Sequence, residues 1–281
     1  MRRLILGSLL LVAAQACEPV PQEGPAVPTA TPAAVTVAPV APIPEGDLGA
    51  SIRRGLAILT ATRDSLPGHV GNDLRCTSCH LDEGRRQDAM PWTGVAARFP
   101  QYRSRSASVT RLEDRINDCF ERSLAGTALA WDDPAMRDMV AYMAHLSQGV
   151  PHGSKVPGQG VPLGSAEPGD TVVGATLYAA QCARCHGANG EGSVGFPPVW
   201  GPRSYNIGAG MARLRTFAGF VRHNMPFDMP GTLTDQQAQD IATFVTTRPR
   251  PDFADKANDW PRGDPPVDVA YPTTAGRVKR P

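Results

Sequence analysis

The 281-residue sequence predicts an all-α protein built from two tandem copies of one small domain. The motif Cys-x-x-Cys-His begins at Cys76 and begins again at Cys182, 106 residues later. Each copy of the motif lies between two segments whose apolar residues recur with helical spacing. The order helix, motif, loop, helix therefore occurs twice, and this indicates an internal duplication.

Four amphipathic helices flank the two motifs. Their apolar positions are, in chain order, Ile52, Leu56 and Leu59; Met136, Val140, Met143 and Leu146; Val173, Leu177 and Tyr178; and Ile241, Phe244 and Val245. Asp132 or Asp133, just before Pro134, is available to cap the second helix. Thr234 is the expected N-cap of the fourth.

The Cys-x-x-Cys-His motif is the attachment signature of c-type haem, because its two thiols form thioethers with the vinyl groups and its His ligates the iron. The residues predicted to attach haem covalently are Cys76, Cys79, Cys182 and Cys185, and the predicted axial histidines are His80 and His186. A redox dithiol or half of a zinc site is a weak alternative for a motif repeated with its His. The fold class expected is therefore two tandem class I cytochrome c-like domains carrying two haem c groups.

The composition divides the chain into six parts. They are an export signal (1–16), a Pro/Ala-rich tether (17–46), a first domain (47–150), a linker (151–169), a second domain (170–250) and a Pro-rich tail (251–281) expected on the surface. A net charge of +1 and a pI of about 7.7 give no global field that would favour nucleic acid.

The first residues have the pattern of a signal for export to the periplasm. Arg2 and Arg3 precede an apolar run that is too short to span a bilayer, and Ala14-Gln15-Ala16 resembles a cleavage site. Cys17 follows at once. Lipidation of Cys17 would make the protein a membrane-tethered lipoprotein, whereas ordinary cleavage would leave Cys17 free or disulfide-paired, and the sequence leaves both open.

Each haem iron needs a sixth ligand, and the repeat register suggests different ones. Met225, between Asn224 and Pro226, lies 39 residues after His186, with Met229 as a weaker alternative. The same count from His80 ends on Cys119, and the 106-residue offset also maps Cys119 onto Met225. The register favours a thiolate ligand over an inert thiol or a disulfide with Cys17. The rivals outside this register are His69, Met90, Met136 and His145.

Arginines concentrate around Cys119. They are Arg98, Arg103, Arg105, Arg111, Arg115 and Arg122, with acidic residues interleaved. Arg115 lies one helical turn before Cys119 and can share its face. Surface ion pairs would account for several of these residues, but guanidinium groups beside a thiol also suit an oxyanion substrate.

With these features the chain resembles the dihaem, tetrathionate-forming thiosulfate dehydrogenase family from about residue 47 to 250. The resemblance is carried by the segments 112–123 (LEDRINDCFERS), 139–143 (MVAYM) and 146–151 (LSQGVP). It implies an active site at a haem ligated by His80 and Cys119, with Arg105, Arg115 and Ser123 as further site residues. It also implies that the second haem, ligated by His186 and Met225, passes electrons to a small periplasmic protein such as a cytochrome c.

The reaction implied is the joining of two thiosulfates into tetrathionate. Some family members place a Lys directly before the second-haem Met, and Asn224 stands there in this chain. A non-catalytic dihaem electron carrier is the first alternative, and a haem subunit of a sulfur-oxidising complex is the second. Both leave Cys119 and the arginines unexplained, so the enzyme is the favoured interpretation.

Overall fold

The computed structural model describes residues 39–273. The expected export signal, Cys17 and most of the tether lie outside the described residues. The α-helices of the described part are α1 (Gly46–Thr60), α2 (Thr62–Ser65), α3 (Leu81–Gly84), α4 (Leu112–Arg122), α5 (Pro134–His145), α6 (Thr171–Gln181), α7 (Ala183–His186), α8 (Leu214–Asn224) and α9 (Asp235–Thr246). Short 3₁₀ helices are η1 (Cys76–Ser78), η2 (Ala96–Arg98), η3 (Gly210–Ala212) and η4 (Ala254–Asn258).

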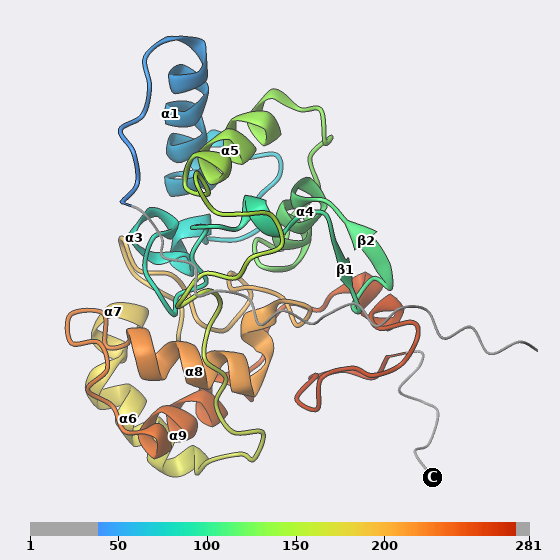
Figure 1. Ribbon diagram of the computed structural model, residues 1–281. Helices are drawn as coiled ribbons and strands as arrows, with labels where there is room; N and C mark the ends of the chain where they lie inside the picture. The colour runs from blue at the N-terminus through green and yellow to red at the C-terminus, as the bar shows by residue number, and fades with distance from the viewer. Residues whose placement is uncertain (1–38, 274–281) are drawn as a thin grey trace, which may run out of the picture. The chain divides into compact units, whose positions relative to one another are not determined.

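The elements α1–α5 form a first domain and α6–α9 a second. Helix α1 packs against α5, and α6 packs against α9 in the corresponding way (Figure 1). A Cβ atom at Gly55 would lie 2.0 Å from the carbonyl oxygen of Asp138, and one at Gly174 would lie 2.1 Å from that of Asp240. In both crossings, therefore, only a glycine permits the observed approach of the two backbones.

The same aspartates bind the partner helix through their carboxylates. Asp138 accepts hydrogen bonds from Ser51 at 2.6 Å and from Arg54 at 2.7 and 2.9 Å. Asp240 accepts one from the backbone N–H of Asp170 at 2.8 Å. In each of the two domains, a glycine and an aspartate thus fix the helix crossing, as a duplicated domain predicts.

Local signals in the sequence mark the helix starts correctly. Asp133, rather than Asp132, caps α5 by accepting a hydrogen bond from the Ala135 N–H at 2.7 Å. Thr234 caps α9 by accepting one from the Gln237 N–H at 3.2 Å.

Two features were not expected from the sequence. An antiparallel hairpin of β1 (Gln101–Arg103) and β2 (Ser108–Thr110) precedes α4. The Pro-rich tail is also not confined to the surface, because Trp260 is only 3% exposed. The backbone N–H of Trp260 donates to the Arg105 carbonyl at 2.8 Å, so this segment packs against the hairpin of the first domain.

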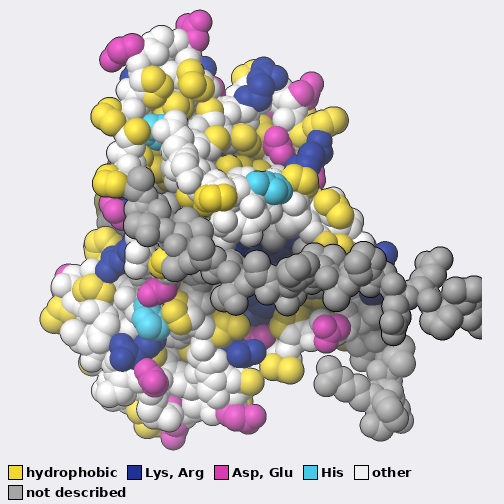
Figure 2. Space-filling model, viewed as in Figure 1, with side chains coloured by type: hydrophobic (Ala, Val, Ile, Leu, Met, Phe, Trp, Pro, Cys, Tyr) yellow, Lys and Arg dark blue, Asp and Glu magenta, His cyan; other side chains and the backbone are white. Residues whose placement is uncertain are grey.

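Positive and negative side chains are interspersed on the visible face of the molecule (Figure 2), as the small net charge leads one to expect. Among residues 39–273, no helix combines the length and the apolar character needed to cross a membrane.

We expect Gly55→Ala and Gly174→Ala each to lower the free energy of unfolding by about 1–3 kcal/mol, because the added methyl group collides with a backbone carbonyl that cannot move freely. Chemical denaturation of the haem-loaded protein measures this loss. Gly68→Ala is the control, since an added Cβ there meets nothing within 4 Å. Unchanged stability in both crossing variants would contradict this account of the packing.

Candidate functional site

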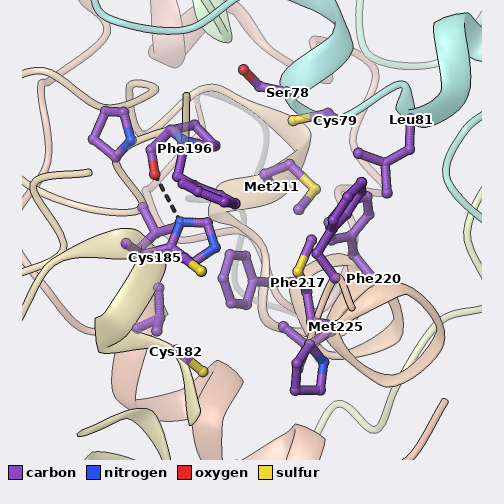
Figure 3. Close-up of a pocket in the computed structure, with 18 of the residues that line it drawn as sticks. Ser78, Cys79, Leu81, Cys182, Cys185, Phe196, Met211, Phe217, Phe220 and Met225 are labelled. Atoms are coloured by element: carbon purple, nitrogen blue, oxygen red, sulfur yellow. Dashed lines mark hydrogen bonds between the residues drawn. The ribbon is translucent and has the colours of Figure 1, made fainter. Parts of the chain in front are cut away.

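The second domain contains a cavity of about 400 Å³ whose wall holds all four residues predicted to bind its haem. Cys182 and Cys185 lie toward one side of the view in Figure 3, and Met225, which follows the end of α8, lies toward the other; His186 also lines the cavity. Most of the remaining lining is apolar, including Phe217, Ile241 and Val245. The alternative Met229 is 53% exposed and is not among the lining residues.

The axial histidine of this domain is oriented for metal binding. Its Nδ1 lies 2.8 Å from the Pro197 carbonyl oxygen (dashed line in Figure 3), which fixes the tautomer and leaves Nε2 available. Burial lowers the pKa of His186, so the imidazole is kept neutral, as a ligand must be. These features fit a haem attached at Cys182 and Cys185.

Met211 is a lining residue that the sequence analysis did not identify. It lies in η3, is 6% exposed, and shares the cavity with Met225 (Figure 3). The 106-residue offset maps Met211 onto Arg105, which is neither a Met nor a Cys, so the repeat register gave no signal for it.

The first domain contains a second cavity, of about 220 Å³, with the corresponding residues on its wall. Cys76, Cys79 and His80 line it, and His80 Nδ1 lies 2.5 Å from the Met90 carbonyl oxygen. Burial lowers the pKa of His80 to about 4, which again keeps the imidazole neutral. The Trp92 ring packs 4.9 Å from the His80 ring, centroid to centroid. This cavity fits a haem by the same criteria as the other.

Helix α4 brings Cys119 to the wall of this first-domain cavity. Arg115, one turn earlier on α4, donates a hydrogen bond to the Cys119 sulfur at 2.8 Å. The charge of that sulfur is the largest cause of a raised pKa at Arg115. Ser123, directly after α4, lines the same cavity.

Of the four rival ligands, Met90 alone lines the first-domain cavity. Its carbonyl already binds His80, which places Met90 on the His80 side. His69 contacts Thr127, Met136 is completely buried in the core, and His145 is buried elsewhere. Of the candidate sixth ligands, Cys119 and Met90 therefore line the cavity together with His80, and only Cys119 lies in the repeat register.

The structure sorts the six clustered arginines into two groups. Arg98, Arg103 and Arg115 line the first-domain cavity. Burial lowers the pKa of Arg103, and the neighbouring charge of Arg115 adds to that effect. Among the described residues, neither Arg98 nor Arg103 forms an ion pair with a carboxylate. The cavity thus has three guanidinium groups near the thiol, and the negative charge of Asp118 raises the pKa of both Arg103 and Arg115.

The other three arginines face elsewhere. Arg111 is exposed, pairs with Asp114 at 3.1 Å and stacks over Trp131. Arg122 is buried and forms a forked ion pair with Asp259 at 2.8 and 2.9 Å.

Arg105 has a different setting, and its expected role in the site stays a prediction. It is not among the residues that line the first-domain cavity. Its guanidinium donates to the Gly208 carbonyl at 3.0 Å and lies 4.8 Å from the Trp260 ring. Burial lowers its pKa to about 10. The hairpin turns this side chain toward the tail, whereas Arg103 on β1 takes the place at the cavity.

The carbonyls at the end of α4 are bound by residues distant in sequence. Asn206 donates from its side chain to the Glu121 carbonyl at 2.8 Å and from its backbone to the Arg122 carbonyl at 3.1 Å. Asn72 donates to the Ser123 carbonyl at 2.9 Å. The second domain, through Asn206, therefore caps two of the last four carbonyls of the helix that carries Cys119, and the first domain binds the other two.

The two cavities share part of their walls. Leu74, Arg75 and Cys79 line both of them. No cluster of three or more His, Cys, Asp and Glu side chains suited to a bare metal ion occurs among residues 39–273.

Comparisons with known proteins agree with this architecture. The family described as the SoxA/TsdA cytochrome c domain matches residues 70–152, and that described as cbb3-type cytochrome c oxidase subunit III matches residues 169–245. Both halves of the chain are therefore cytochrome c domains, which bind haem c, and the predicted fold class is confirmed.

Several similar proteins are named thiosulfate dehydrogenase. The one from Allochromatium vinosum is 48% identical over 237 residues, covering 80% of this chain and 88% of the relative. The one from Psychrobacter arcticus is 44% identical over 234 residues, covering 81% and 72%. The solved thiosulfate dehydrogenase TsdBA of Marichromatium purpuratum is similar with a TM-score of 0.71 and 38% identity, over 78% of this chain and 50% of that chain. This chain thus spans about half the length of that solved protein.

We expect Asn206→Ala to loosen the end of α4, because it leaves the Glu121 carbonyl without its donor at a cost of about 1–3 kcal/mol. Faster hydrogen exchange of the last amides of α4 measures the effect. The exposed Asn258→Ala is the control. Equal exchange in the two variants would show that the second domain does not hold this helix.

Proposed function

Because this chain belongs to the thiosulfate dehydrogenase family, we propose that it oxidises thiosulfate and joins two molecules of it into tetrathionate. The observation that carries the proposal is the placement of Cys119. Its sulfur shares a cavity with Cys76, Cys79 and His80 and accepts a hydrogen bond from Arg115 at 2.8 Å. An electron carrier alone would have no need of a thiol beside unpaired arginines.

We further propose two haem c groups. Cys76 and Cys79 would attach the first and Cys182 and Cys185 the second. His80 with Cys119, and His186 with Met225, would be the axial ligands. Bound haems would supply the acceptors for the two electrons that leave one pair of thiosulfates.

The thiol of Cys119 gives the reaction a two-step route. In the first step its thiolate sulfur bonds to the outer sulfur of one thiosulfate, and two electrons are released. In the second, the outer sulfur of another thiosulfate attacks that same sulfur, so tetrathionate leaves and the Cys119 thiolate is restored. Two thiosulfate dianions thus give one tetrathionate dianion and two electrons.

The arginines of the cavity support an anionic substrate. Two dianions that approach one another repel, and fixed positive charge in a partly desolvated cavity offsets this repulsion. Arg115 is positioned by the thiol itself, and Arg98 and Arg103 have no described carboxylate partner that would cancel their charge. Ser123 adds a hydroxyl on the same wall.

The remaining proposals concern the setting of the enzyme. Electrons would pass from the first domain to the second and then to a small periplasmic acceptor such as a cytochrome c. Export by residues 1–16, with or without a lipid on Cys17, would place the protein there. The domain limits at residues 47–150 and 170–250 stay predictions as well.

We expect Cys119→Gly to abolish tetrathionate formation while both haems stay attached, because the variant removes the sulfur that carries the first thiosulfate. Turnover with thiosulfate and ferricyanide, and haem content from the pyridine haemochrome spectrum, measure the two properties. Met136→Leu, in the core of the same domain, is the control. Full activity of Cys119→Gly would refute the proposed route.

We expect Arg115→Gln and Arg103→Gln each to lower kcat/KM for thiosulfate by about 10²-fold or more, as the loss of one charged donor does at comparable sites. Arg111→Gln should retain activity, because that guanidinium faces solvent. Initial-rate kinetics on haem-loaded protein make the comparison. Equal losses in all three variants would point to a general charge effect instead of a local site.

A further inference from the structure

Asn224 is a buried amide at the end of α8 that binds the first domain. It is the last residue of the helix, is only 1% exposed, and directly precedes Met225 on the wall of the second-domain cavity. Its side-chain Nδ2 donates to the Asp88 carbonyl at 2.9 Å. A carbonyl can only accept, so this contact fixes the orientation of the amide. Asn224 therefore connects the turn that carries Met225 to a segment of the first domain.

The segment that Asn224 binds, residues 88–90, also orients the axial histidine of the other cavity. Met90 lines the first-domain cavity, and its carbonyl oxygen lies 2.5 Å from His80 Nδ1. Only Ala89, which is completely buried, separates Met90 from Asp88. One hydrogen bond therefore joins the end of α8 to the short segment that binds His80.

The backbone of this segment is strained and is held by contacts from outside. Asp88 has a φ of 59° and Met90 a φ of 53°, in the left-handed region that costs L-amino acids free energy. The backbone N–H groups of these two residues donate to the carbonyls of Gly158 and Gly160 in the linker, at 2.8 and 2.7 Å. The linker thus binds the two N–H groups, and Asn224 binds the Asp88 carbonyl. Loss of one attachment allows the segment to relax and the Met90 carbonyl to move.

A contribution to stability does not account for the amide of Asn224. Its Oδ1 is buried without a hydrogen-bond partner among the described residues. Leaving a buried acceptor unsatisfied costs about as much free energy as the bond made by Nδ2 contributes. An apolar side chain of similar size would avoid that cost. The distinctive effect of the amide is therefore on the position of the Asp88 carbonyl.

We propose that Asn224 is a positioning residue that couples the two haem sites, because it holds in place the carbonyl that binds His80. A ligand histidine whose Nδ1–H donates to a carbonyl is more basic, and a more basic ligand favours the oxidised iron. The bond made by Asn224 thus lowers the reduction potential of the first haem, although Asn224 belongs to the second domain. The inference rests on the ligation by His80 proposed above, but it does not depend on the sulfur substrate.

The main test is Asn224→Leu in the full-length, haem-loaded protein, which removes the donor and keeps a side chain of similar size. Hydrogen exchange at the amides of Asp88 and Met90 should become about tenfold faster, the equivalent of one lost hydrogen bond. Spectroelectrochemical titration should show a higher reduction potential of the first haem, and the low-spin EPR signal of that haem should shift. A purely local role of Asn224 would change only the second haem, which lies next to it.

Gly158→Ala tests the same segment from the linker side. Gly158 has a φ of +67°, and an added Cβ would lie 2.6 Å from the Cβ of Gln87, so the substitution displaces the carbonyl that binds the Asp88 N–H. The first-haem potential should rise in this variant as well, while the second haem should not change. Since Gly158→Ala leaves α8 intact, the test does not depend on whether Asn224→Leu folds.

His223→Gln is the matched control, because His223 directly precedes Asn224 on α8 and is exposed. The proposal is overturned if the exchange rates or the first-haem potential of Asn224→Leu equal those of this control. It is also overturned if Gly158→Ala leaves the first haem unchanged. Haem content, measured separately, shows whether both cofactors are attached, so a failure of the two-haem assignment is distinguished from a failure of this coupling.

Discussion

The capping of α4 by a distant part of the chain is the constraint on which the candidate active site depends. A helix end leaves several carbonyls without partners, and here Asn206 and Asn72 bind those of residues 121–123. Cys119 is one turn before that end, so the position of its sulfur depends in part on the bonds that Asn206 makes across the domain boundary, whereas Asn72 belongs to the first domain itself. The buried ion pair of Arg122 with Asp259 adds a third attachment, from the tail. The position of Cys119 in the first domain therefore depends in part on contacts with the second domain and with the tail.

The arginines around the site differ in whether they form ion pairs. Arg122 has Asp259 and Arg111 has Asp114, and these two arginines stabilise the structure around α4. Arg98 and Arg103 have no such described partner and line the cavity. Arginines without an ion-pair partner mark a place where a negatively charged molecule is expected, and Arg98 and Arg103 lie at the first-domain cavity.

The sequence predicted what is determined locally. The Cys-x-x-Cys-His motifs, the caps Asp133 and Thr234 and the paired helices depend on residues a few positions apart, and the repeat register led to Cys119. The direction of Arg105 could not be predicted, because it depends on an unexpected hairpin and on Trp260, which lies 155 positions later. Arg250 packs on the Tyr205 ring, and the backbone N–H groups of Gly201 and Ile207 bind the carbonyls on either side of Arg250. The spacing of apolar residues along the sequence gives no information about contacts of that kind.

The glycine and aspartate that hold each helix crossing have a consequence for how such a protein can diversify. Gly55 with Asp138, and Gly174 with Asp240, keep the same close approach in both copies, although most of the side chains around them differ. The crossing lies apart from the segments that carry Cys119 and Met225. Each domain is therefore free to exchange the residue that faces its cavity without losing its framework. One copy could acquire catalytic activity while the other kept its role in electron transfer, and selection could act on the two roles separately.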